Sequence, residues 1–118
     1  MDEKILPAYF YQNHLGTEPV RDWLKDLDKD DRFVIGTDIK TVEFGWPIGM
    51  PTCKPMGKGL YEVRSNLSSN RIARVIFCIH DRQIVLLHGF IKKTQKTSKQ
   101  DLEIALNRKS QLETANEK

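Results

Sequence analysis

The sequence has no long apolar segment and only two cysteines. Its apolar runs, such as Ile84–Leu87, are far too short to cross a bilayer, and no apolar run of signal-peptide length follows the N-terminus. We therefore expect a cytoplasmic protein with no membrane partner. Because the cytosol is reducing, we expect Cys53 and Cys78 to be free thiols rather than a disulfide.

Several kinds of chemistry lack the residues that they need. The three histidines are scattered without metal-ligand spacing, so we expect no metal. The segment Gly57-Lys58-Gly59 has the glycine spacing of neither the P-loop nor the dinucleotide-binding motif, so we expect no cofactor. Cys78 and His88 formally allow a nucleophilic pair. A cysteine in an apolar strand more often packs in the core, however, and we set this alternative aside.

Charge is distributed unevenly along a chain whose 118 residues, 39% hydrophobic and 30% charged, fit one domain over residues 1–118. Residues 1–51 hold 6 Lys and Arg against 10 Asp and Glu, a net of −4, whereas residues 52–118 hold 13 against 6, a net of +7. Solubility alone does not require this segregation. The second part of the chain is therefore predicted to attract a polyanion such as nucleic acid.

Hydrophobic spacing and turn residues predict seven elements in the order β-α-α-β-β-β-α. A short aromatic strand at Ile5–Tyr11 comes first. Two helices that form an antiparallel hairpin follow, one starting at Pro19 and one running from the cap candidate Asp28 to Gly45. Three prolines and three glycines predict a rigid loop over residues 46–59.

The second half of the chain predicts a sheet followed by a helix. Residues rich in β-branched and aromatic side chains predict three antiparallel strands at Leu60–Ser65, Ile72–Ile79 and Gln83–Ile91. The segment from Ser98 to Asp101 has the Ser/Thr-x-x-acid form of a helix start, so a last helix covers the sheet or projects from it. The sequence thus predicts an α+β fold, a mainly antiparallel sheet packed against a helical hairpin.

Strand alternation groups several polar side chains. It places Glu62 and Arg64 on one face of their strand, and it places Leu86, His88 and Phe90 together on one face of theirs. The register between the strands does not follow from the sequence. We predict a shallow cationic groove at the strand ends, although strand-end Lys and Arg are often only solvated.

A cationic groove suits one reaction that needs no metal. In RNA cleavage, a ribose 2′-hydroxyl attacks the adjacent phosphate, which requires positioning, proton transfer and neutralisation of phosphoryl charge. Arg64 and Arg74 suit charge stabilisation because arginine binds phosphate bidentately and stays charged. Lys54, Lys92 or Lys93 suits proton exchange because a lysine crowded by other cations loses its proton more readily.

Motifs spread along the chain resemble the RelE/HigB superfamily of type II toxin–antitoxin toxins, in particular its phage-derived HigB-like branch. The segments that carry the resemblance are Pro19-Val20-x-x-Trp23-Leu24, Gly49-x-Pro51-x-x-Lys54, Gly59-Leu60-Tyr61-Glu62-Val63-Arg64, Arg74-Val75-x-Phe77, Leu86-Leu87-His88-Gly89-Phe90-x-Lys92-Lys93, Lys96-Thr97 and Ala105-x-x-Arg108. The chain departs from the branch at Ser98, where proline is usual, and lacks a tyrosine after Lys93 that some of these enzymes use.

The resemblance implies a ribosome-dependent mRNA endoribonuclease that stops translation. It further implies a cognate helix-turn-helix antitoxin that binds the toxin in a hetero-oligomer. The matching catalytic positions are Lys54, Arg64, Arg74, Lys92 and Lys93. We expect RNA contacts from Lys58, Arg71, His88, Phe90 and Lys96.

Two other functions stay open at this point. The first is a nucleic-acid-binding or corepressor module that has the same fold without catalysis, since a fold does not prove an activity. The second is an interaction domain whose basic face docks an acidic partner protein.

Overall fold

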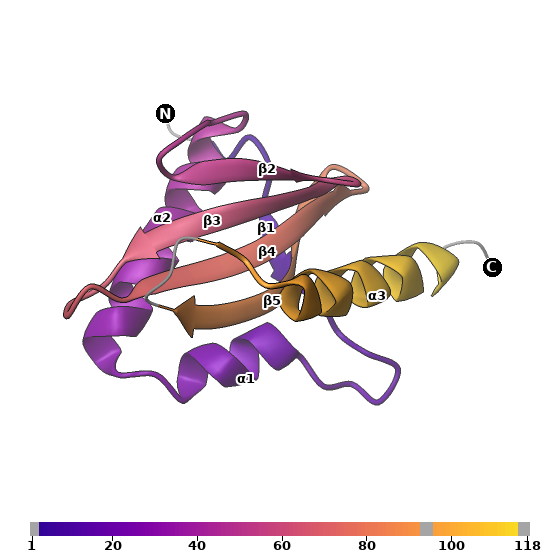
Figure 1. Cartoon of the computed structure of the whole chain (residues 1–118). Helices are drawn as coiled ribbons and strands as arrows, with labels where there is room; N and C mark the ends of the chain where they lie inside the picture. The colour runs from indigo at the N-terminus through magenta and orange to yellow at the C-terminus, as the bar shows by residue number, and fades with distance from the viewer. Residues whose placement is uncertain (1–2, 93–95, 116–118) are drawn as a thin grey trace.

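The structure is a computed structural model that describes residues 3–92 and 96–115 (Figure 1). Its elements are β1 (Ala8–Phe10), α1 (Pro19–Lys25), α2 (Lys29–Gly45), β2 (Cys53–Gly57), β3 (Leu60–Asn66), β4 (Ile72–His80), β5 (Gln83–Lys92) and α3 (Lys99–Ala115). The α+β class and all of the predicted helices and strands are confirmed. The first strand is shorter than predicted, and the sheet has one strand more.

That extra strand is β2, which lies in the segment predicted to be a loop. The strand order is β1-β5-β4-β3-β2, so β2 forms one edge of the sheet, and only the pair of β1 and β5 is parallel. Pro55 lacks a backbone N–H, but an edge strand has a side that needs no ladder bond. The prediction for residues 53–57 was therefore wrong because proline excludes a central strand, not an edge strand.

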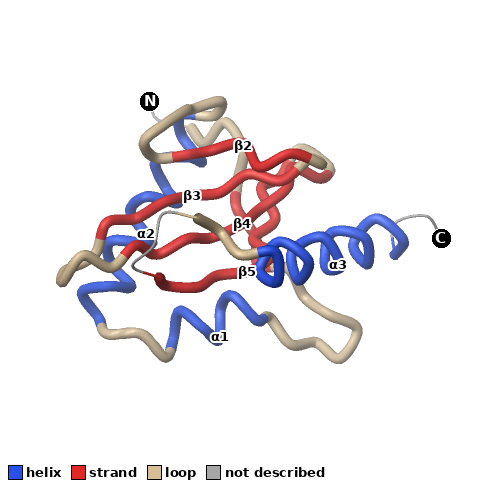
Figure 2. The backbone as a smooth tube through the Cα atoms, viewed as in Figure 1, coloured by secondary structure: helices blue, strands red, loops and turns tan. Residues whose placement is uncertain are grey.

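Helices cover both faces of this sheet (Figure 2). On one face α1 packs on β5 and α2 on β3, and their apolar residues share a core with Val63, Val75 and Leu86; we call this the helix-pair face. On the other face α3 packs on β4 and β5 through residues such as Ala105; we call this the α3 face. Figure 1 shows that the C-terminal part of α3 extends past the strands.

An irregularity in β5 decides which side chains reach the α3 face. Ile76 pairs with His88, but Phe77 pairs with Leu86, so Leu87 is an extra residue in β5. Leu86 consequently lies in the helix-pair core, whereas Phe90 lies in the core under α3. The predicted common face of Leu86, His88 and Phe90 was wrong for Leu86, because simple alternation fails across a bulge.

Both cysteines are buried free thiols on opposite faces of the sheet. Burial raises the pKa of the Cys53 and Cys78 thiols to about 11, so neither is a thiolate at neutral pH. Free thiols were the prediction, and it is confirmed. Within the described part of the chain, no helix is long and apolar enough to span a membrane.

Candidate functional site

The strand register brings the predicted cations of four strands, β2 to β5, onto one face of the sheet. Lys54 lies opposite Glu62, Arg64 opposite Arg74, and Arg74 opposite Phe90. Directly opposed residues of antiparallel strands project to the same side. We call the resulting surface the cationic face; it comprises Lys54, Glu62, Arg64, Arg74, His88, Phe90 and Lys92 on the α3 face of the sheet.

A buried carboxylate organises the arginines of the cationic face. The Arg64 Nε donates a hydrogen bond to Glu62 Oε1 at 2.9 Å, and an Arg74 guanidinium nitrogen lies 3.9 Å from the same oxygen. Arg74 also donates to the Thr97 hydroxyl at 3.0 Å, and this hydroxyl donates to the second Glu62 oxygen. Burial lowers the pKa of Arg74, and the Glu62 charge partly opposes that effect. The cluster thus fixes both guanidinium groups.

A second carboxylate, Asp101, joins α3 to β5. Its Oδ1 lies 2.8 Å from His88 Nε2, while its Oδ2 lies 2.8 Å from Lys92 Nζ and accepts a 2.6 Å bond from the Ser98 hydroxyl. The Asp101 backbone N–H donates to the Ser98 hydroxyl at 3.1 Å, which confirms the predicted helix start. Burial raises the pKa of Asp101, but the bonds from Lys92, Ser98 and His88 outweigh it and leave the pKa at about 2.

Exposure differs sharply within the cationic face. The exposed side-chain fraction is 34% for Lys92, 15% for His88, 14% for Arg64 and 0% for Arg74. The Phe90 ring is buried, since His88 stacks on it with centroids 5.4 Å apart and Lys92 Nζ lies 5.2 Å from its centroid. A ligand on this surface therefore meets Arg64, Lys92 and His88 before it meets Arg74 or Phe90.

The remaining predicted residues have different positions. Lys54 is an exposed member of the cationic face, Lys96 is exposed next to the buried Thr97, and Lys93 falls outside the described residues. Lys58 lies in the turn before β3, and the first residue of that strand, Leu60, is already roughly 13 Å along the strand from Arg64 at about 3.3 Å per residue. The structure does not bring this lysine to the arginines.

Arg71 stands apart from the cationic face as well. It lies between β3 and β4, and its guanidinium nitrogens donate to both Asp31 oxygens on α2 at 2.8 and 3.0 Å. The hydrogen bonds from Arg71 lower the pKa of the Asp31 carboxyl. The bidentate pair ties the turn to the N-terminal end of α2.

Three residues that organise the site were not among the predicted site residues, namely Glu62, Thr97 and Asp101. Glu62 alternates with Arg64, which was the available signal for it. The other two reach the sheet only because α3 folds back across β5, and no local pattern predicts that contact. Within the part of the chain that the structure describes, no group of three or more His, Cys, Asp and Glu is arranged to hold a metal ion.

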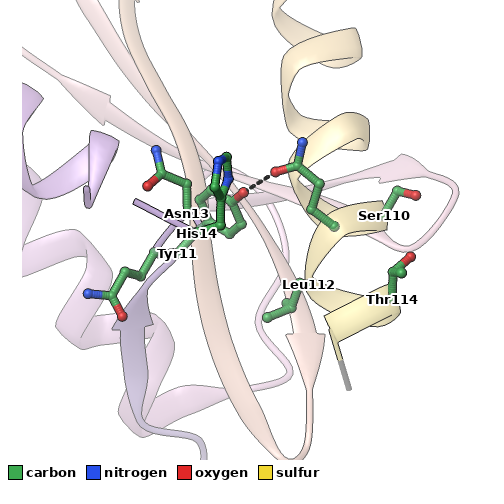
Figure 3. Close-up of a pocket in the computed structure, with 8 residues that line it drawn as sticks. Tyr11, Asn13, His14, Ser110, Leu112 and Thr114 are labelled. Carbon is green, nitrogen blue, oxygen red and sulfur yellow. Dashed lines mark hydrogen bonds between the residues drawn. The ribbon is translucent and has the colours of Figure 1, made fainter. Parts of the chain in front are cut away.

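One hollow on the molecule lies away from the cationic face. A cavity of about 600 Å³ separates the segment around Tyr11 and His14 from the last turns of α3 (Figure 3). The Tyr11 hydroxyl donates to Gln111 across it, and among the described residues no Lys, Arg, Asp or Glu lines it. A smaller cavity, about 280 Å³, reaches Arg64 from the side of α2.

Comparison with protein families gave one informative match. The family model described as "Phage derived protein Gp49-like (DUF891)" matches residues 22–110, well over half of the chain. These residues include the helices α2 and most of α3 as well as the whole cationic face from β2 to β5. A comparison with curated proteins found no match.

Proposed function

The chain belongs to the phage-derived Gp49-like family, a HigB-like toxin family of the RelE superfamily, and from this we propose that it is a toxin that cleaves mRNA on the ribosome. The membership confirms the resemblance drawn from the motifs. The observation that best supports an endoribonuclease is the gathering of Lys54, Arg64 and Lys92 on one surface around two fixed carboxylates. That surface suits a phosphate flanked by proton-transfer groups.

The proposed reaction is internal transfer at one phosphodiester. A ribose 2′-hydroxyl loses its proton and attacks the adjacent phosphorus, the bond to the 5′-oxygen breaks, and that oxygen takes up a proton. The products are a 2′,3′-cyclic phosphate and a 5′-hydroxyl end. DNA lacks the attacking hydroxyl, so only RNA is a substrate.

The predicted catalytic residues differ in burial, and we propose different roles for the exposed and the buried ones. Arg64 is partly exposed and, in this proposal, binds the phosphoryl oxygens as negative charge accumulates on them. Lysines exchange the two protons in this proposal: Lys92 acts with Lys54 of the cationic face or with Lys93, which lies outside the described residues. Arg74 is fully buried and holds Glu62 and Thr97 in place, so it supports the phosphate site from beneath.

The proposal includes protein partners. A toxin of this family acts beside a cognate antitoxin, for which we propose a helix-turn-helix protein that forms a hetero-oligomer with this chain. A small adjacent open reading frame with helix-turn-helix spacing is the expected observation. Its absence together with full tolerance of the isolated chain by the cell would contradict this part of the proposal.

A second candidate function has one observation in its favour. Arg74 is buried, and Glu62 and Asp101 offset part of the positive charge of Arg64 and Lys92. A surface that only binds RNA or operator DNA needs no more than this. Tight nucleic-acid binding without cleavage, even on translating ribosomes, would favour a corepressor or binding module over an enzyme.

Induced expression in the absence of antitoxin tests the main proposal. We expect growth to halt and translated mRNAs to acquire internal breaks. Untranslated RNAs in the same cells are the internal control, since they should stay intact if the ribosome is required. Intact transcripts alongside continued protein synthesis would contradict both the toxin and the nuclease.

A further inference from the structure

Asp101 carries more polar contacts than the start of a helix requires. Its backbone N–H completes the cap with Ser98 and its Oδ2 accepts from the Ser98 hydroxyl, but the carboxylate also reaches β5. There it contacts two side chains of the cationic face, His88 and Lys92, each at 2.8 Å. The side chain therefore does something that capping alone does not explain.

The chemistry of the pair fixes the hydrogen positions. An ionised carboxylate only accepts hydrogen bonds, so the 2.8 Å contact requires a proton on His88 Nε2. In a neutral His88 ring the second nitrogen, Nδ1, then carries the lone pair. A carboxylate that selects the tautomer and orientation of a histidine is a recurrent device for presenting the other ring nitrogen.

The same carboxylate restrains Lys92. A lysine side chain has four rotatable bonds and is mobile when exposed, yet Lys92 Nζ lies between Asp101 Oδ2 and the face of the Phe90 ring. His88 stacks on that ring, so Asp101, His88, Lys92 and Phe90 form one unit. Asp101 is the member of the unit that comes from α3.

We propose that Asp101 is a positioning residue for the RNA-cleaving site, holding His88 as its Nε2–H tautomer and Lys92 at a fixed place on the cationic face. This inference rests on the proposed function. It assigns Asp101 no contact with RNA. Its negative charge in fact opposes RNA binding, and this gives the role a distinctive signature.

The signature is a pair of effects with opposite sign. Asp101→Asn removes one negative charge from the cationic face, so affinity for single-stranded RNA stays the same or rises, with a salt dependence steeper by about one phosphate contact. Cleavage on translating ribosomes should instead fall by about 10- to 100-fold, because His88 and Lys92 lose their fixed geometry. General damage to the fold would weaken both.

The matched control is Glu103→Gln, which removes the same charge two residues further along α3. Glu103 is mostly exposed and lies near Lys99 rather than the sheet. Binding should be measured with a 2′-O-methyl RNA oligonucleotide, which lacks the attacking hydroxyl. Cleavage by Asp101→Asn within twofold of the Glu103→Gln rate, or parallel losses of binding and cleavage, would overturn the proposal.

A measurement on the unmodified chain separates this inference from the proposed function. Nitrogen-15 chemical shifts of the His88 ring, followed across a pH titration, should identify Nε2 as the protonated nitrogen of the neutral form. A neutral ring protonated on Nδ1 would overturn the role of Asp101 even if the chain cleaves mRNA. Intact mRNA together with the Nε2–H form would instead refute the nuclease, while the finding that Asp101 fixes the His88 tautomer would still hold.

Discussion

The pH dependence of stability offers a quantitative test of the contacts that Asp101 makes with His88, Lys92 and Ser98. The hydrogen bonds from Lys92, Ser98 and His88 outweigh burial and lower the pKa of Asp101 from 3.8 to about 2. The native state therefore binds a proton at this carboxyl less readily than the unfolded chain does. By linkage, Asp101 stabilises the fold only while it is ionised.

The size and the pH range follow from that shift. At roughly 1.4 kcal/mol for each tenfold change in proton affinity, lowering the pKa from 3.8 to about 2 corresponds to about 2 kcal/mol of unfolding free energy. Because the native pKa is depressed, this contribution is fully present above the unfolded value near 3.8 and is lost as the pH falls to about 2. Asparagine cannot titrate, so Asp101→Asn lacks the contribution at every pH.

Urea unfolding followed by circular dichroism measures the effect. The wild type should exceed Asp101→Asn in unfolding free energy by about 2 kcal/mol at about pH 7, and the gap should shrink toward about pH 2.5. Glu103→Gln is the matched control and should show a small gap without this trend. A wild-type advantage that does not change with pH would refute the reasoning, because it would mean that the carboxyl is not held ionised by its partners.

Three further substitutions test other parts of the structure. Glu62→Gln should destabilise the fold by about 3 to 5 kcal/mol in urea unfolding, since it leaves the buried Arg74 charge without its carboxylate; a change below about 1 kcal/mol would contradict the buried cluster. Gly89→Ala should cost about 1 to 3 kcal/mol, because its Cβ would lie 2.5 Å from Trp23 ring carbons, and unchanged stability would show that α1 does not pack there. Arg71→Ala should lower the melting temperature by breaking the Asp31 pair but spare mRNA cleavage; a loss of cleavage in the folded variant would place Arg71 in the RNA site.

The elements that the sequence predicted are those with an uninterrupted local signal. The central strands are rich in β-branched residues, and α2 runs from just after Asp28 to Gly45 as the pattern indicates, although Asp28 makes no side-chain cap bond. Strand β2 has no such signal, because Pro55 and the flanking glycines also fit a loop. Its strand character comes from pairing with β3, a tertiary interaction.

The candidate site was predictable only in part for the same reason. Alternation placed Glu62 beside Arg64, and the motifs named the cations. Whether Arg64 and Arg74 share a face depends on register, and the side to which His88 projects depends on the extra residue Leu87 in β5. Neither the register nor this bulge can be predicted from the sequence of one strand, because both depend on how that strand pairs with its neighbour.

The most direct test of the central claim compares the wild type with Arg64→Ala on translating ribosomes. The wild type should produce new 5′-hydroxyl ends within translated mRNA. Loss of about 2 to 4 kcal/mol of transition-state stabilisation should reduce those ends by roughly 30- to 1,000-fold in the variant, with its circular dichroism spectrum and melting temperature retained. Equal cleavage by both proteins, or translation arrest by the wild type with no new ends, would contradict a phosphate site built on the cationic face.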